Sequence, residues 1–205
     1  MKPFNNTTIK QSINLTIVFT TAIFSFSSCK KDDPKKPVET NSQEVLTTVL
    51  LTGYNIDDSL NAKYQFSYKW EDLDGDGGNS PIIDTIALDS GIRYNCKVLI
   101  LDKTKSPIET VSDEIENEKN AHQFFYTPST NLVGKFSTEV LDFDDNNPKL
   151  PVGLEFNVLT KSNQTYNLPL IGSLNIVLCH YDGVQKTTSK SDESDIDINF
   201  PVKLK

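Results

Sequence analysis

Apolar and polar residues alternate along most of the chain after residue 44. Residues 64–71 read Tyr-Gln-Phe-Ser-Tyr-Lys-Trp-Glu, and residues 154–158 and 196–204 show the same period of two. Such alternation is typical of a strand that buries one face and leaves the other in water. Pro201 takes a polar-face position in the last of these segments, which favours an edge strand because proline has no N–H to donate.

Clusters of glycine, proline, asparagine and aspartate separate the alternating segments, as turns between strands require. A helical spacing is confined to residues 111–119, where Val111 and Ile115 are four apart, and it predicts one exposed helical turn. Nine short strands without a substantial helix predict an all-β fold, an antiparallel β-sandwich. The expected strands are 45–52, 64–71, 82–88, 93–101, 122–127, 133–142, 153–160, 173–180 and 196–204.

An internal two-repeat organisation is also indicated. Each unit would start with a Phe-Ser strand and an acidic loop, and would continue through two apolar strands and an acidic segment to a closing strand. A chance likeness between two strand–loop units is the alternative. The matching residues are Phe66, Ser67, Asp72, Asp74 and Asp76 in the first unit and Phe136, Ser137, Asp142, Asp144 and Asn146 in the second.

The first 28 residues have the pattern of a secretory signal peptide. Lys2 and Lys10 precede an apolar run at 13–26, which is followed by two serines. A run of this length is too short to cross a bilayer core of about 30 Å. Cys29 directly after the serines resembles the lipidation site of a bacterial lipoprotein, where the cysteine becomes the acylated first residue. An ordinary cleavage site beside an incidental cysteine is the alternative.

After Cys29 the sequence predicts a polar tether up to residue 44 and a domain over residues 45–205. Residues 30–44 have no apolar period and would reach about 50 Å when extended. The chain after the signal peptide is long enough for one domain with a substantial hydrophobic core or for a sandwich of two small repeats.

An acidic balance limits the partners of the protein. The chain has 28 acidic and 20 basic residues, a formal net charge of −8, and two of its lysines precede the predicted cleavage site. A nucleic-acid partner requires basic surface, so it is not expected. Electrostatic binding to anionic lipid is not expected either, which leaves the lipid anchor as the route to the membrane.

Two cysteines remain after Cys29. Export permits a disulfide between Cys96 and Cys179. However, Cys96 occupies one of the apolar positions in the alternation of its segment, whereas Cys179 occupies one of the positions between the apolar residues of its own segment. The pattern places one cysteine toward the core and the other outward, and it leaves a disulfide open.

The loops sort to two ends if every strand reverses direction, as short antiparallel links usually require. One end then collects the connections at 72–81, 102–121, 143–152 and 181–195, together with both histidines of the chain. Loops at one end of a rigid sandwich commonly carry binding function.

Two acidic loops are candidate calcium sites. Asp72, Asp74 and Asp76 with Gly77 match the first half of a calcium loop, but Ile83 stands where an EF-hand needs glutamate. A calcium loop closed by other carboxylates and a plain Asp/Gly turn both remain open. The second candidate loop, which lacks the glycine, consists of Asp142, Asp144 and Asn146.

His122 and His180 form a third candidate cation site. If they lie at the same end, within reach of Asp102, Asp182 and the acidic loops, two imidazoles and a carboxylate would suit zinc, copper or nickel. Histidines that merely end strands at the surface are the alternative. An enzyme is not expected, since the sequence has no zinc-protease motif, phosphate loop, nucleophile elbow or Cys-His pair.

Four stretches carry a family resemblance, which covers most of residues 44–202. They are Glu44-Val45-Leu46-Thr47-Thr48-Val49, Asp72-Leu73-Asp74-Gly75-Asp76-Gly77-Gly78, His122-Gln123-Phe124-Phe125-Tyr126 and Pro151-Val152-Gly153-Leu154. They resemble a family of small, functionally uncharacterised lipoproteins from Bacteroidota, often labelled "type 1 periplasmic binding fold". That label implies an α/β fold with parallel strands, whereas the period of two predicts an all-β domain.

The same resemblance bears on cellular location. Lys31, Asp32 and Asp33 resemble the signal that sends lipoproteins of this phylum to the outer face of the outer membrane. We therefore expect a surface-exposed, lipid-anchored binding module, with a small ligand or an outer-membrane uptake receptor as partner. A structural or adhesive envelope lipoprotein without a small-molecule ligand is the alternative.

Overall fold

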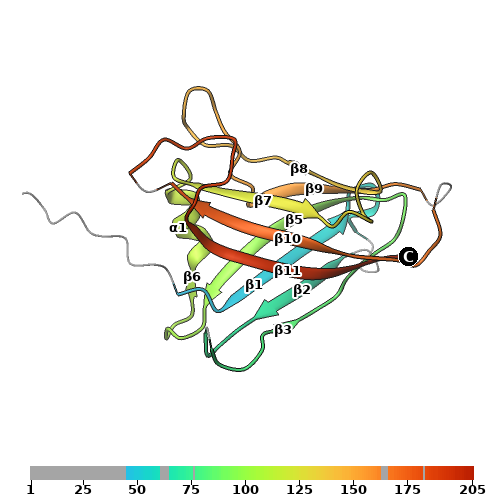
Figure 1. The fold of residues 1–205 in the computed structure, drawn as a ribbon, viewed down its shortest axis with the longest axis horizontal. Coiled ribbons are helices and arrows are strands. Elements are labelled where there is room, and N and C mark those ends of the chain that lie inside the picture. The colour runs from blue at the N-terminus through green and yellow to red at the C-terminus, as the bar shows by residue number, and fades with distance from the viewer. Residues whose placement is uncertain (1–44, 61–64, 76, 163–165, 182) are drawn as a thin grey trace, which may run out of the picture. The chain divides into compact units, whose positions relative to one another are not determined.

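The alternating segments form two antiparallel-dominated sheets that face each other as a β-sandwich (Figure 1). The computed structural model describes residues 45–60, 65–75, 77–162, 166–181 and 183–205, all within one compact unit, Asn41–Lys205. The strands are β1 (Thr48–Asn55), β2 (Phe66–Glu71), β3 (Ile82–Ile83), β4 (Ile86–Leu88), β5 (Arg93–Asp102), β6 (Glu109–Thr110), β7 (His122–Pro128), β8 (Phe136–Val140), β9 (Glu155–Thr160), β10 (Leu170–His180) and β11 (Ser194–Leu204), and the helices are η1 (Ile56–Asp58) and α1 (Val111–Asn117).

The order of the strands confirms the predicted sandwich. Among the described residues, one sheet has the order β3-β2-β1-β5-β9-β8, with β6 paired to β5, and the other has the order β4-β11-β10-β7. All pairings are antiparallel except that of β4 with β11. β4 and β11 belong to the third and the ninth of the nine predicted strands. If each strand runs opposite to the one before it, the third and the ninth run in the same direction, and the parallel pairing of β4 with β11 agrees with this.

The predicted strand 82–88 is wrong as a single element. β3 pairs with β2 in the larger sheet, whereas β4 pairs with β11 in the smaller one, so the chain crosses between sheets at residues 84–85. Asp84 stabilises the crossing, because its side chain accepts a hydrogen bond from the amide of Lys69 and its own amide donates to the Lys69 carbonyl.

Two further predictions need smaller corrections. The segment predicted as strand 133–142 is a strand only over β8. The predicted exposed turn at 111–119 is α1, which buries Val111, Ser112 and Ile115. The hydroxyl of Ser112 accepts a hydrogen bond from the Ile100 amide in β5 and so fixes the helix to the larger sheet.

The core lies between the two sheets. β11 shows how the pattern builds it, since the apolar residues from Ile196 to Leu204 are buried at every second position and the residues between them are exposed. The proposed repeat units correspond less closely, because β5 lies in the larger sheet and its counterpart β10 in the smaller one.

Cys96 and Cys179 are both buried and both free. Cys96 belongs to the main core, and burial raises the pKa of its thiol to about 12. Cys179 belongs to a second apolar cluster with Val177 and Tyr181, so it lies away from the main core, as its parity predicts, but is covered rather than exposed.

Several predicted features lie outside the described residues. They are the signal peptide, Cys29, the residues Lys31, Asp32 and Asp33, the tether, and the carboxylates Asp76 and Asp182. Within the described ranges, no helix is both long and apolar enough to cross a membrane.

Candidate metal centre

The two histidines lie side by side at one end of the sandwich. His122 begins β7, His180 ends β10, and the antiparallel register pairs them directly. Their ring centroids are 4.3 Å apart and the rings are nearly parallel, with an interplanar angle of 24°. Their parity matches that of the buried pair Phe124 and Leu178, so both imidazoles lie on the core-facing side of the sheet. The prediction that they share one end is confirmed.

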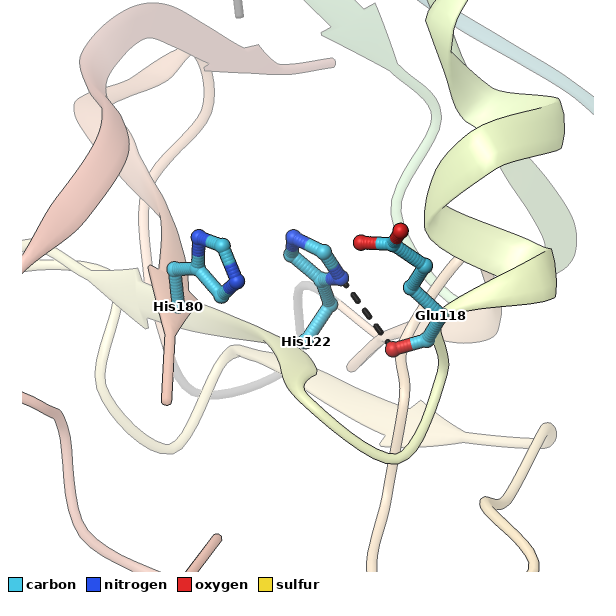
Figure 2. A group of neighbouring side chains, drawn as sticks. All are labelled: Glu118, His122 and His180. Carbon is cyan, nitrogen blue, oxygen red and sulfur yellow. Dashed lines mark hydrogen bonds between the residues drawn. The ribbon is translucent and has the colours of Figure 1, made fainter. Parts of the chain in front are cut away.

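A residue that sequence reasoning missed, Glu118, holds one of the rings. Glu118 follows the last turn of α1, and its main-chain carbonyl lies 3.2 Å from Nδ1 of His122. Carbonyls at the end of a helix lack partners inside the helix, and a histidine nearby commonly binds them. Figure 2 shows the ring of His122 between His180 and Glu118, with this hydrogen bond as a dashed line.

Asp195 is the second residue that the sequence analysis missed. The alternation of β11 places it on the polar outer face, but a β-bulge shifts the pairing between Leu178 and Cys179, and the register resumes at Ser194. Bulges commonly change the direction in which a side chain points. The Oδ2 atom of Asp195 lies 3.9 Å from Nε2 of His122 and 3.9 Å from Nδ1 of His180.

Two atoms of this group are buried without a hydrogen-bond partner. They are Nε2 of His122, whose side chain is 1 % exposed, and Oδ2 of Asp195. Buried polar atoms are nearly always satisfied, so each exception calls for an explanation. A separation of 3.9 Å is too long for a hydrogen bond. It lies within the separation of about 4.2 Å that two zinc bonds of about 2.1 Å can span.

Burial shifts the pKa values of His122 and Asp195 in opposite directions. It lowers the pKa of His122, so the ring is neutral at neutral pH, as a metal ligand must be. It raises the pKa of Asp195, although both histidines oppose the shift. Burial thus makes the ionised form of Asp195 less stable, and a bound cation would restore the stabilisation that water no longer gives it.

Two hollows adjoin the candidate centre. One, of about 380 Å³, is lined by His180, Tyr181 and residues of the 184–193 connection. The other, also about 380 Å³, lies between β1–β2 and the start of β11, and its lining includes Trp70, Asp72 and Asp195. Asp195 thus lies close to both histidines and also lines an opening that contains other acidic groups.

Among the described residues, one group of three acidic, histidine or cysteine side chains has ligand atoms all within 4.8 Å of one another, and it consists of Glu118, His122 and His180. Asp102 is not a member. Its carboxylate accepts hydrogen bonds from the amide and hydroxyl of Thr104 within its own turn.

The first acidic loop has its own internal hydrogen bonds. Asp72 accepts from the amide of Gly75, and Asp74 accepts from both the amide and the side chain of Asn79. These contacts lower the pKa of Asp74 and hold its carboxylate within the turn. Calcium binding by Asp72, Asp74 and Asp76 stays a prediction.

The second acidic loop directs its carboxylates toward protein groups. Asp142 accepts hydrogen bonds from the amides of Gly153, Leu154 and Glu155. Asp144 is fully buried, and its Oδ2 atom lies 3.2 Å from the equally buried ammonium of Lys186. Asn146 donates its side-chain amide to Asp144. Calcium at Asp142, Asp144 and Asn146 likewise stays a prediction, but these contacts give both aspartates a structural role.

Comparison with known proteins returns no family. No protein-family model matches the chain, and no curated protein or solved structure matches it either. The functional argument therefore rests on the site itself.

Proposed function

We propose that this protein is a lipid-anchored binding module on the outer-membrane surface, and that its ligand is a divalent transition-metal ion held between His122 and His180. The observation that carries the proposal is the buried, unpartnered Nε2 atom of His122, which faces the unpartnered Oδ2 atom of Asp195 at 3.9 Å. Nitrogen ligands favour zinc, copper and nickel over calcium and magnesium, which prefer oxygen.

The anchor and the acidic surface fit the same role. An acidic hollow attracts cations, and a membrane-bound domain would keep a captured ion beside the outer membrane. An uptake receptor in that membrane is the partner that such a module would serve. The alternative, a structural or adhesive module, requires no buried histidine nitrogen without a hydrogen-bond partner.

Zinc titration of the full mature protein, purified in detergent, tests the proposal. We expect wild type to bind one equivalent. We expect the His122→Ala, His180→Ala double variant to lose more than about 100-fold in affinity, because losing only an outer-shell partner already costs about 10–100-fold.

Asp74→Asn is the matched control, since it removes a carboxylate from the first acidic loop and leaves the histidines intact. Circular dichroism should show that both variants are folded. Equal stoichiometry and affinity in wild type and the double variant would exclude the histidine centre.

Anchoring gives a separate prediction. Acyl chains contribute about 0.8 kcal/mol per buried CH₂, so the several chains of a bacterial lipoprotein attach it almost permanently. Cys29→Ala should therefore produce a soluble or uncleaved protein, as judged by membrane fractionation.

The proposed surface-sorting signal is tested by a separate measurement. Changing Lys31, Asp32 and Asp33 to alanine should preserve lipidation and abolish cleavage by protease added to intact cells. If the variant is digested as fast as wild type, these residues do not direct surface exposure.

A further inference from the structure

The tautomer of His122 is fixed by its surroundings. Nδ1 of His122 lies 3.2 Å from the main-chain carbonyl of Glu118, and a carbonyl oxygen can only accept a hydrogen bond. Nδ1 therefore carries the proton. A metal ion can therefore bind only the lone pair of the other ring nitrogen, Nε2. Metal-binding histidines are commonly oriented in this way, by donating the other N–H to a carbonyl.

The position of this lone pair discriminates between the two acidic neighbours. Nε2 of His122 is buried without a hydrogen-bond partner, and Oδ2 of Asp195 lies 3.9 Å from it. The same oxygen is equally far from Nδ1 of His180. Glu118, by contrast, contacts Nδ1 of His122 through its main-chain carbonyl, and its carboxylate, which lies within 4.8 Å of a nitrogen of each histidine, belongs to an exposed side chain.

We propose that Asp195 is the third protein ligand of the metal ion, together with Nε2 of His122 and Nδ1 of His180. Glu118 is a positioning residue that acts through its main-chain carbonyl. This inference rests on the proposed function. Two imidazole nitrogens and one carboxylate oxygen are a ligand set for zinc, copper(II) or nickel, and three protein ligands leave a position for water or an external donor.

The placement of Asp195 makes the ion exchangeable. His122 is almost completely buried, but Asp195 also lines the hollow between β1–β2 and β11. Asp72 and Asp197 line the same hollow, which gives a cation an acidic route to the centre. A bound ion would therefore enter and leave past Asp195, as cargo does, and would not be sealed in the core.

Two isosteric variants compare the acidic neighbours. Asp195→Asn should weaken zinc binding by about 100-fold or more, since it removes the carboxylate ligand and puts an amide in its place. Glu118→Gln retains the main-chain carbonyl that holds His122 and should weaken zinc binding much less than Asp195→Asn does. Asp195→Asn is expected to fold, because Oδ2 of the native carboxylate is buried without a hydrogen-bond partner and the neutral amide reduces that cost.

Cobalt(II) absorption distinguishes a ligand from a residue that only shapes the site. In Asp195→Cys a thiolate would bond to the metal, so cobalt should produce a sulfur-to-metal charge-transfer band that wild type lacks. Glu118→Cys is the matched control and should show no such band. Cys96 and Cys179 are present in all three proteins and so do not affect the comparison.

The outcomes separate this inference from the proposed function. If wild type binds no zinc, the proposed function fails. If wild type binds zinc and Asp195→Asn binds it equally well, only the assignment of Asp195 fails. A charge-transfer band in Glu118→Cys and none in Asp195→Cys would make Glu118 the ligand instead.

Discussion

Lys186→Met is expected to lower the free energy of unfolding by about 3–5 kcal/mol, because it leaves the buried carboxylate of Asp144 without its cation. Both side chains are completely buried, and Nζ of Lys186 lies 3.2 Å from Oδ2 of Asp144. The ammonium also donates to the main-chain carbonyl of Lys119 at 2.9 Å. Urea denaturation followed by circular dichroism measures the change.

Lys190→Met is the matched control, since Lys190 lies in the same connection but is exposed, and surface substitutions usually change stability by less than about 0.5 kcal/mol. The Lys186→Met, Asp144→Asn double variant should recover part of the loss, because the uncompensated charge is gone. A Lys186→Met protein as stable as wild type would show that the pair contributes no stability.

This ion pair also supports the candidate metal centre. Lys186 belongs to the connection between β10 and β11, which His180 and Asp195 flank. Its bond to the carbonyl of Lys119 fixes the residue next to Glu118, whose own carbonyl holds His122. We therefore expect Lys186→Met to weaken zinc binding as well as stability.

Most of the fold follows from the period of two. β11 illustrates why, since a strand with one buried face must place an apolar residue at every second position. The crossing between β3 and β4 does not follow from it. Residues 82–88 look like one strand because their division depends on two different partners, β2 and β11, which lie far away in the sequence.

The same limit applies to the candidate site. Strand alternation was enough to bring His122 and His180 together, because their positions depend on strand direction alone. Asp195 was missed because a bulge reverses its parity, and bulges have no clear signal in this sequence. Glu118 was missed because its contact with His122 uses a main-chain carbonyl, which any residue would supply.

The acidic loops show that similar compositions can have different roles. Asp74 stabilises its own exposed turn through Asn79, whereas Asp144 binds a buried lysine. The sequence could not separate these roles, since the partner Lys186 is 42 positions away from Asp144 and no local pattern connects them. The structure distinguishes them by burial.

Asp142→Ala is expected to destabilise the domain by about 2–5 kcal/mol, because three main-chain amides lose one acceptor. Oδ1 of Asp142 accepts from Gly153 at 2.9 Å and from Glu155 at 3.2 Å, and Oδ2 accepts from Leu154 at 2.9 Å. Hydrogen bonds to charged groups contribute about 1.5–3 kcal/mol each, and a buried donor without an acceptor costs about 1–3 kcal/mol.

The backbone around Gly153 is closely packed against the smaller sheet. Gly153 is buried with φ of 97°, and a Cβ atom there would lie 2.8 Å from Cβ of Phe124. The hydroxyl of Tyr126 donates to the Gly153 carbonyl from the other sheet. Asp142 thus fixes a segment that is packed directly against β7, the strand that begins with His122.

A graded series of variants tests this role of Asp142 by urea denaturation. Asp142→Asn keeps one carbonyl oxygen and should lose less stability than Asp142→Ala, because that oxygen can still accept from the amides of Gly153 and Glu155. Asp145→Ala, three residues along and exposed, should stay within about 1 kcal/mol of wild type, since its ion pair with Lys119 is at the surface. Equal stability of Asp142→Ala and Asp145→Ala would mean that the three amides find other acceptors, and the carboxylate would then be available for a cation.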